Sequence, residues 1–291
     1  MFEGFEQKRL RANGVEINTL ISGDGPPLLL PHGYPQSHLI WHRVAPALAK
    51  YYTVVATDLR GYGDSEKREG KDDHSNYSKR EMARDQIEIM QQLGFDSFYL
   101  CGHDRGARVS HRLAIDYPAA VNRLMLLDIS PTLCMYEQTT MDFARSYWWW
   151  FFLIQPKPFP EDMIAAAPEK YLKKKIGWGY AGMSAFTPET YAAYLSYVSD
   201  PATMHAMCED YRAAASIDLE HDRADRDAGK KIACPLHVIW GEHGVVNRCF
   251  SPIADWQRVA VDVRGRTLRC GHYIPEEMPE DLLVEMREFF R

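Results

Sequence analysis

Short apolar runs, many of them β-branched, recur along the chain and alternate with helical patterns. The runs lie at Pro26–Gly33, Tyr52–Thr57, Phe98–Cys101, Arg123–Asp128, Leu236–Trp240 and Thr267–Cys270. The helical patterns lie at Ser78–Gly94, Gly106–Tyr117 and Pro279–Phe290. This alternation predicts right-handed βαβ units, and therefore an α/β protein whose mostly parallel sheet is flanked by helices on both faces. Such a sheet binds ligands at the carboxyl ends of its strands.

Local signals indicate where some of these elements begin and end. Two runs with polar alternation, Phe5–Arg11 and Val15–Ser22, flank Asn13-Gly14, a dipeptide that favours a tight hairpin turn. Ser78 and Glu81 have the spacing of a capping box, which predicts that a helix begins after Ser78.

The alternation stops between residues 131 and 221. This stretch is rich in Trp, Tyr, Phe and Met, and Pro and Gly separate its short helical patterns without any strand-like run. We interpret residues 131–221 as a helical cap domain that is inserted into a core domain formed by residues 1–130 and 222–291.

Composition excludes several classes of function. The formal net charge is −6 and the basic residues form no stripe, so we expect no nucleic-acid partner. No apolar run is long enough for a bilayer, and the first ten residues, MFEGFEQKRL, lack the apolar core of a signal peptide, so we expect no membrane association and a cytoplasmic location. The six cysteines are scattered, which predicts neither a disulfide framework nor a metal site.

The segment Leu100–Gly106, with the sequence LCGHDRG, is the most informative for chemistry. A predicted strand runs into Gly-x-x-x-Gly and a helical pattern follows directly, which is the setting of a nucleophile elbow. The middle residue is usually Ser, whereas here it is Asp104. A carboxylate suits displacement at an sp³ carbon that bears a leaving group, and the product is an ester that water must hydrolyse. We therefore predict Asp104 as a catalytic nucleophile.

Companion residues follow in the chain order that this fold requires. Tyr34 comes just after an early strand, and its backbone N–H, together with that of Arg105, would form an oxyanion hole. His272 follows the last predicted strand, where the fold places its catalytic base.

The acid that orients His272 has two candidates. Its usual place, the loop after Leu236–Trp240, holds Glu242 and no Asp. Asp128 ends the preceding strand, and we assign the role to Asp128 with Glu242 as the alternative. The segment beginning Asp58-Leu59-Arg60 is given a structural role, with Asp58 and Arg60 expected to pair.

With these residues placed, the chain resembles the fluoroacetate (haloacetate) dehalogenases of the α/β-hydrolase superfamily over nearly its whole length. The blocks that carry the resemblance are HGYPQSH, DLRGYGDS, GHDRGARVSHRLA, LLDISPT, WWWFF and CEDYRAAASIDLEHD. Epoxide hydrolases and haloalkane dehalogenases share the Asp nucleophile but usually carry Trp directly after it. Here Arg105 follows Asp104, and Arg108 lies one helical turn further on.

Two arginines at this spacing suit an anionic substrate. Residues three apart lie on the same face of a helix, so Arg105 and Arg108 can converge on one carboxylate, each through its guanidinium fork. Two carboxylates about 4 Å apart repel by roughly 4 kcal/mol at an effective dielectric of about 20. A carboxylate that attacks an α-halo acid therefore needs cations beside it.

The resemblance also implies a halide site made of a His-Trp pair and a Tyr from the cap. Trp150 matches the Trp and Tyr211 the Tyr, while Trp149 stands where the family has His. Fluoride is strongly hydrated and leaves only where donors replace its water. The loss of one donor predicts that chloro- and bromoacetate are hydrolysed faster than fluoroacetate.

The resemblance and the residues together predict hydrolytic dehalogenation of short 2-haloalkanoates such as haloacetate, with no cofactor and no metal. The resemblance further implies a homodimer. One alternative is an epoxide hydrolase, in which Tyr211 and one of Tyr191, Tyr194 or Tyr197 would protonate the opening oxygen. Another is a ligand-binding receptor of the same fold that does not turn over.

Overall fold

The computed structural model describes residues 1–291, and eight strands of the chain form one sheet. The strand order is β1-β2-β4-β3-β5-β6-β7-β8. The pairs β1–β2 and β2–β4 are antiparallel, and every other neighbouring pair is parallel. The strands are β1 (Glu6–Ala12), β2 (Val15–Ser22), β3 (Pro27–Pro31), β4 (Thr53–Thr57), β5 (Phe98–His103), β6 (Val121–Leu127), β7 (Leu236–Gly241) and β8 (Val263–Leu268).

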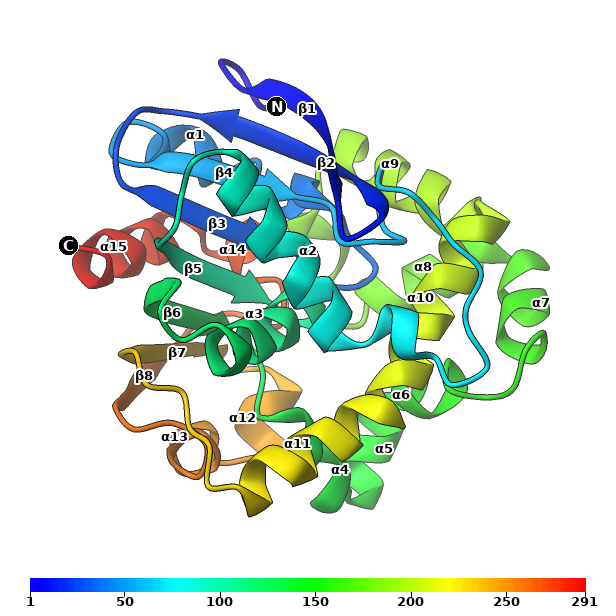
Figure 1. The fold of residues 1–291 in the computed structure, drawn as a ribbon. Helices are drawn as coiled ribbons and strands as arrows, with labels where there is room; N and C mark the ends of the chain where they lie inside the picture. The colour runs from blue at the N-terminus through cyan, green and yellow to red at the C-terminus, as the bar shows by residue number, and fades with distance from the viewer.

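Helices cover both faces of this sheet (Figure 1). On one face lie α2 (Lys79–Gln92) and α3 (Arg105–Asp116), and on the other lie α1 (Ala45–Leu48), α14 (Ile274–Glu277) and α15 (Pro279–Phe289). Successive residues of a strand point to opposite faces. In β3, Leu29 accordingly packs in the core on the α2–α3 side, whereas Leu28 and Leu30 pack in the core on the α15 side. Both faces of β3 are buried, which is why its residues form a continuous apolar run and do not alternate with polar ones.

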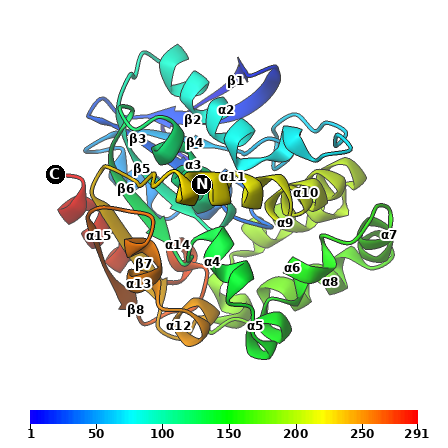
Figure 2. The ribbon, with the colours of Figure 1, turned by 60° about the horizontal axis from the view of Figure 1, so that its bottom comes forward.

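The stretch between β6 and β7 contains helices only. They are α4 (Thr132–Glu137), α5 (Met141–Ser146), α6 (Trp148–Phe152), α7 (Phe159–Ala165), α8 (Pro168–Ile176), η3 (Gly182–Ala185), α9 (Pro188–Ser199), α10 (Pro201–Ala214) and α11 (Ile217–Asp227). Helices α7–α10 lie beside one end of the sheet, at the right in Figure 1, and Figure 2 shows the same arrangement from another side. None of the helices combines the length and apolar character needed to cross a membrane.

Most element predictions are confirmed. The hairpin between β1 and β2 has its turn at Asn13 and Gly14, both of which have positive φ. The side chain of Ser78 caps α2 by accepting a hydrogen bond from the backbone N–H of Glu81. The proposed boundary at residue 221 falls within α11. This helix contacts α3 through an ion pair of 2.8 Å between Asp222 and Arg112. The division into core and cap stays a prediction.

Two predictions are wrong. The last strand is Val263–Leu268 and not Thr267–Cys270, because β8 is an edge strand whose exposed residues alternate with partly buried ones and hide the apolar signal. Asp58 and Arg60 do not pair. Asp58 accepts hydrogen bonds from the backbone N–H and ring of His38, and Arg60 forms a bidentate ion pair with Asp85 of α2.

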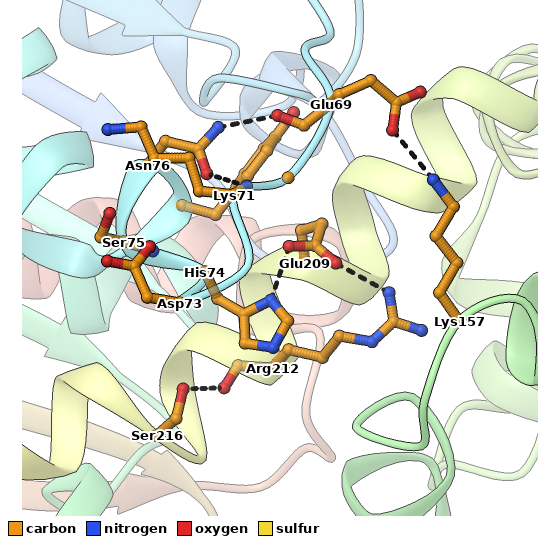
Figure 3. Close-up of polar contacts among 12 residues, drawn as sticks. Glu69, Lys71, Asp73, His74, Ser75, Asn76, Lys157, Glu209, Arg212 and Ser216 are labelled. Atoms are coloured by element: carbon orange, nitrogen blue, oxygen red, sulfur yellow. Dashed lines mark hydrogen bonds and ion pairs between the residues drawn. The ribbon is translucent and has the colours of Figure 1, made fainter.

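A polar network fastens α10 to the loop before α2 (Figure 3). His74 Nδ1 lies 2.8 Å from Glu209 Oε2, and the other carboxylate oxygen of Glu209 accepts a hydrogen bond from Arg212 at 2.8 Å. Lys157, which precedes α7, donates a hydrogen bond of 2.9 Å to Glu69 in the same loop before α2. The contact between His74 and Glu209 holds α10, the helix that carries Tyr211, against this loop.

Candidate active site

Asp104 stands at the sharp turn between β5 and α3. Its φ is 46° and its ψ is −111°, a conformation that non-glycine residues rarely adopt. The flanking glycines permit this turn, since a Cβ on Gly102 would lie 2.6 Å from the carbonyl oxygen of Gly106, and a Cβ on Gly106 would lie 2.4 Å from that of His32. The turn buries the carboxylate of Asp104 at the carboxyl edge of the sheet, with 3% of the residue exposed.

The two oxygens of the Asp104 carboxylate have different surroundings. Oδ1 accepts a hydrogen bond of 2.9 Å from the backbone N–H of Tyr34, which follows the neighbouring strand β3. Oδ2 lies 3.7 Å from Nε2 of His272. The backbone N–H of Arg105 makes no hydrogen bond with this carboxylate, so only one of the two predicted oxyanion-hole donors contacts it in the structure.

His272, in the loop after β8, is oriented by Asp128, which directly follows β6. His272 Nδ1 lies 2.5 Å from Asp128 Oδ2, and Asp128 Oδ1 accepts a hydrogen bond of 3.0 Å from the backbone N–H of Gly241. The alternative acid, Glu242, is exposed and makes no hydrogen bond with His272. The geometry therefore favours Asp128 as the acid.

The surroundings of Asp104 keep its carboxyl ionised. Burial raises the pKa of Asp104, but electrostatic interactions with His272, His103, Arg108 and Arg105 outweigh that effect and lower the pKa to about 2. An ionised carboxylate is the form that a nucleophile requires.

Arg105 and Arg108 are both buried beside the nucleophile, but they do not present open guanidinium forks as predicted. Nε and Nη2 of Arg105 donate to Asp210 of α10 at 2.8 and 2.7 Å. Nη1 of Arg108 donates to Thr132 Oγ1 at 2.9 Å and to the carbonyl oxygen of Ser130 at 3.2 Å. One nitrogen on each side chain remains buried without a partner, Arg105 Nη1 and Arg108 Nε.

Three more buried donors without partners belong to aromatic residues packed beside these two arginines or beside one another. They are Trp150 Nε1, Tyr211 Oη and Tyr136 Oη. The guanidinium carbon of Arg105 lies 4.2 Å from the ring centre of Tyr211, that of Arg108 lies 4.6 Å from the ring centre of Trp150, and the rings of Tyr136 and Trp150 are 5.0 Å apart. An unpaired buried donor is costly, so such groups are rare in folded proteins. Their concentration here indicates a site for an anion that accepts hydrogen bonds.

Trp149 has different neighbours from Trp150. Its ring centre lies 4.1 Å from the ammonium of Lys175 and 4.6 Å from the ring centre of Tyr147. Trp150 and Tyr211, by contrast, have ring centres 6.4 Å apart and contact the two arginines. The structure therefore brings Trp150 and Tyr211 together and places Trp149 against Lys175.

Sequence reasoning missed Asp210, Tyr136 and Lys175. Asp210 directly precedes Tyr211, which the sequence analysis had assigned to the site. This position next to a predicted site residue was the one signal in the sequence that could have identified Asp210. Tyr136 lies in a short helix with no diagnostic pattern. Lys175 belongs to a run of three lysines, which is typical of a solvated surface, although its spacing from Tyr171 places it on the buried face of α8.

A cavity of about 310 Å³ reaches His272 from the outside. Tyr147, Trp178, His243 and Arg248 are among the residues that line it. Water can therefore approach the predicted base without passing the buried arginines.

Comparisons with known proteins agree with this arrangement. Residues 26–254 match the family model of the alpha/beta hydrolase fold. The chain is similar to a fluoroacetate dehalogenase of Burkholderia sp, with 45% identity over 290 residues, 99% of this chain and 95% of that protein. It is also similar to a soluble epoxide hydrolase of Corynebacterium sp. (strain C12), with 32% identity over 283 residues, 96% of this chain and 94% of that protein.

Among solved structures, a provisionally named alpha/beta hydrolase from Nostoc sp PCC 7120 has a TM-score of 0.97 and 52% identity to this chain. The match covers 100% of this chain and 99% of that one. The predicted fold class, with its mostly parallel sheet, is thereby confirmed.

Proposed function

The chain belongs to the α/β-hydrolase fold family, in the branch of the fluoroacetate dehalogenases, and on this premise we propose that it hydrolyses short 2-haloalkanoates to 2-hydroxy acids and halide. The observation that carries the proposal is the group of buried unpaired donors, from two arginines and three aromatic residues, next to an ionised carboxylate at a nucleophile elbow. No cofactor or metal takes part in the proposed reaction.

In the first step, Oδ2 of Asp104 attacks the α-carbon and the halide leaves with the electrons of the carbon–halogen bond. The product is an ester of Asp104, and the substrate carboxylate is unchanged. Oδ1 is already held by the backbone N–H of Tyr34, which leaves Oδ2 as the attacking oxygen. Arg105 Nη1 and Arg108 Nε are suited to hold the substrate carboxylate, because each is a charged donor without another partner.

In the second step, His272 Nε2 removes a proton from water, and the resulting hydroxide attacks the ester carbonyl of Asp104. As the ester C–O bond breaks, the proton left on the attacking oxygen passes to the departing alkoxide, so the 2-hydroxy acid leaves and the Asp104 carboxylate is regenerated; His272 then releases its proton to solvent. Asp128, at 2.5 Å from Nδ1, holds the ring and stabilises the positive charge that forms on His272. The backbone N–H of Tyr34 stabilises the oxyanion that develops on Oδ1.

The departing halide needs hydrogen-bond donors. Trp150 Nε1 and Tyr211 Oη are buried, unpaired and next to the arginines, so we assign the halide to them. Tyr136 Oη is a further donor of this group. Trp149 is the third predicted halide residue, and its contact with Lys175 makes its contribution the least supported of the three.

The epoxide hydrolase alternative lacks its second proton donor among the candidates. The hydroxyl of Tyr194 donates to Glu276 at 3.1 Å, that of Tyr191 to Glu169 at 3.3 Å, and that of Tyr197 to Asp64 at 3.4 Å. A neutral epoxide also has no need of two buried arginines. A receptor that does not turn over would have no need of an ionised Asp104 facing a His272–Asp128 pair.

A halide-release screen tests the proposed function. Fluoro-, chloro- and bromoacetate should release halide, and an epoxide such as epichlorohydrin should not be opened at a comparable kcat/KM. Epoxide opening without halide release from any haloacetate would support the epoxide hydrolase, and neither activity would support the receptor.

Trapping of the ester tests the mechanism. His272→Ala should still be alkylated by chloroacetate, and intact-mass analysis followed by peptide mapping should find one carboxymethyl group on Asp104. His243→Ala, at the mouth of the same cavity, is the matched control and should turn over without accumulating the adduct. An unlabelled His272→Ala protein, or a label on a cysteine, would contradict the mechanism.

A further inference from the structure

Lys175 of the cap helix α8 is buried beside the nucleophile without a carboxylate in contact. Only 1% of the residue is exposed, and Nζ donates a hydrogen bond of 2.9 Å to Tyr273 Oη. The same nitrogen lies 4.1, 5.3 and 5.5 Å from the ring centres of Trp149, Tyr273 and Tyr34. A buried ammonium is costly unless it is paired, so the position of this charge needs a reason other than stability.

The other cations around Asp104 differ in how their charge is balanced. Asp210 forms ion pairs with both Arg105 and Lys79, so neither of these cations is free of a carboxylate. Arg108, like Lys175, forms no ion pair in the structure. Each of these two cations lies over one of two successive indoles, Arg108 over Trp150 and Lys175 over Trp149.

The proposed reaction brings two anions together, the carboxylate of Asp104 and that of the substrate. Both negative charges persist through the displacement, because the halide takes over the charge that Asp104 loses. Two cations that are not already neutralised by carboxylates can balance them, and Arg108 and Lys175 are the two that the pocket offers.

We propose that Lys175 is a specificity residue for the anionic substrate, whose ammonium holds the haloalkanoate beside Asp104 from the Trp149 side of the pocket. This inference rests on the proposed function. It assigns to the cap a cation that complements Arg108 of the core, and it explains why a lysine lies among aromatic rings in place of a packed apolar residue.

The ammonium also makes binding sensitive to pH. Burial lowers the pKa of Lys175 and the charge of Asp104 raises it, and the result is a pKa of about 7. The titratable groups that face Lys175 are Tyr34, His103, Asp104 and Tyr273. Protonated Lys175 is present below this pKa, so the attraction for the substrate should be lost as pH rises through about 7.

The test compares kcat/KM for chloroacetate and for neutral chloroacetamide across this pH range. His272 acts only after the ester has formed, so kcat/KM reports the free enzyme up to the displacement step. Lys175→Met should lower kcat/KM for chloroacetate about tenfold or more below pH 7, mainly through KM, and should abolish the fall toward alkaline pH. Lys175→Arg should keep activity and also abolish that fall, because a guanidinium stays charged.

Exposed Lys174 supplies the matched control, and Lys174→Met should behave as the wild type. An unchanged pH profile in Lys175→Met, or equal losses on the acid and the amide, would overturn the proposal and leave Lys175 a packing residue. Acetate binding, measured by calorimetry at pH 6 and pH 8.5, separates this outcome from failure of the proposed function. If the wild type releases no halide, the proposed function fails. In that case, acetate binding that weakens as pH rises in the wild type but not in Lys175→Met would still support Lys175 as a ligand of the anion. Acetate binding that does not depend on pH would overturn the proposal.

Discussion

Asp210 connects α10 to Arg105 of the candidate active site, and its replacement by asparagine should destabilise the protein strongly. Its carboxylate accepts two hydrogen bonds from Arg105, at 2.8 and 2.7 Å, one from Tyr62 Oη at 2.6 Å, and one from Lys79. Asp210 and Arg105 are fully buried, and Lys79 is nearly so. Asn has the same shape, so Asp210→Asn removes the charge without opening a cavity.

The magnitude follows from what the amide cannot do. In asparagine, one carboxylate oxygen is replaced by an NH₂ group, which is a donor and faces the donors that this oxygen accepted from. The substitution therefore removes a charge-assisted hydrogen bond worth about 1.5–3 kcal/mol. The charge of Arg105 then has no carboxylate partner, while Lys79 keeps a weaker contact with Asp218 at 3.3 Å. Breaking a buried ion pair on one side costs about 3–5 kcal/mol, and we expect Asp210→Asn to lower the free energy of unfolding by that amount. This is a large part of a typical stability of about 5–15 kcal/mol.

Equilibrium unfolding in urea measures the effect, with fluorescence and circular dichroism recorded together to check that the transitions coincide. Asp142→Asn is the control, because Asp142 forms an ion pair with Arg248 on the surface and its loss should leave stability nearly unchanged. A loss below about 1 kcal/mol in Asp210→Asn, with an unchanged m-value, would refute the claim that the Asp210 charge compensates Arg105 and Lys79.

Further substitutions test the site itself. Asp128→Asn should lower kcat by about four orders of magnitude, because the imidazolium loses its stabilising charge, and Glu242→Gln should be mild. The reverse ranking in a steady-state assay would move the acid to the loop after β7. Arg108→Met should raise KM and lower kcat on haloacetates, through loss of a charge-assisted bond worth about 1.5–3 kcal/mol, and should affect chloroacetamide far less. Equal losses on both substrates would mean that Arg108 stabilises the fold and does not bind the carboxylate. The wild type should hydrolyse chloroacetate faster than fluoroacetate, and Trp149→His should raise the ratio of the fluoro to the chloro kcat/KM, because an added donor helps most where the leaving ion is most strongly hydrated. A wild type that already prefers fluoroacetate would show that position 149 does not limit fluoride departure.

The sequence by itself determined the mostly parallel sheet, except for the bounds of its last strand, and the positions of the chemical groups along the chain. Apolar runs and helical patterns are local signals, and in a parallel sheet every strand delivers its carboxyl end to the same edge. Asp104 after β5, Asp128 after β6 and His272 after β8 were therefore expected to meet, and the structure brings them together. Gly102 and Gly106 also predicted the sharp turn at Asp104, because only residues without a Cβ fit at these two positions.

The partners of the charged residues were decided by the tertiary structure. Arg60 pairs with Asp85 and not with Asp58, and Arg105 pairs with Asp210, which lies 105 positions away in the sequence. Sequence spacing predicts contacts within one helix or one strand, but a long charged side chain can reach any element that packs beside it. Which acid lies there depends on how the helices pack.

The same reason explains Lys175. A run of three lysines on a short helix is typical of a solvated surface, and only the packing of α8 against the core turns one of them inward among Tyr34, Trp149 and Tyr273. Burial, and with it the lowered pKa of this lysine, arises only when α8 packs against the rest of the protein. The order of residues along the chain fixes which groups reach the sheet edge, and the packing of the helices between β6 and β7 fixes which charges surround them.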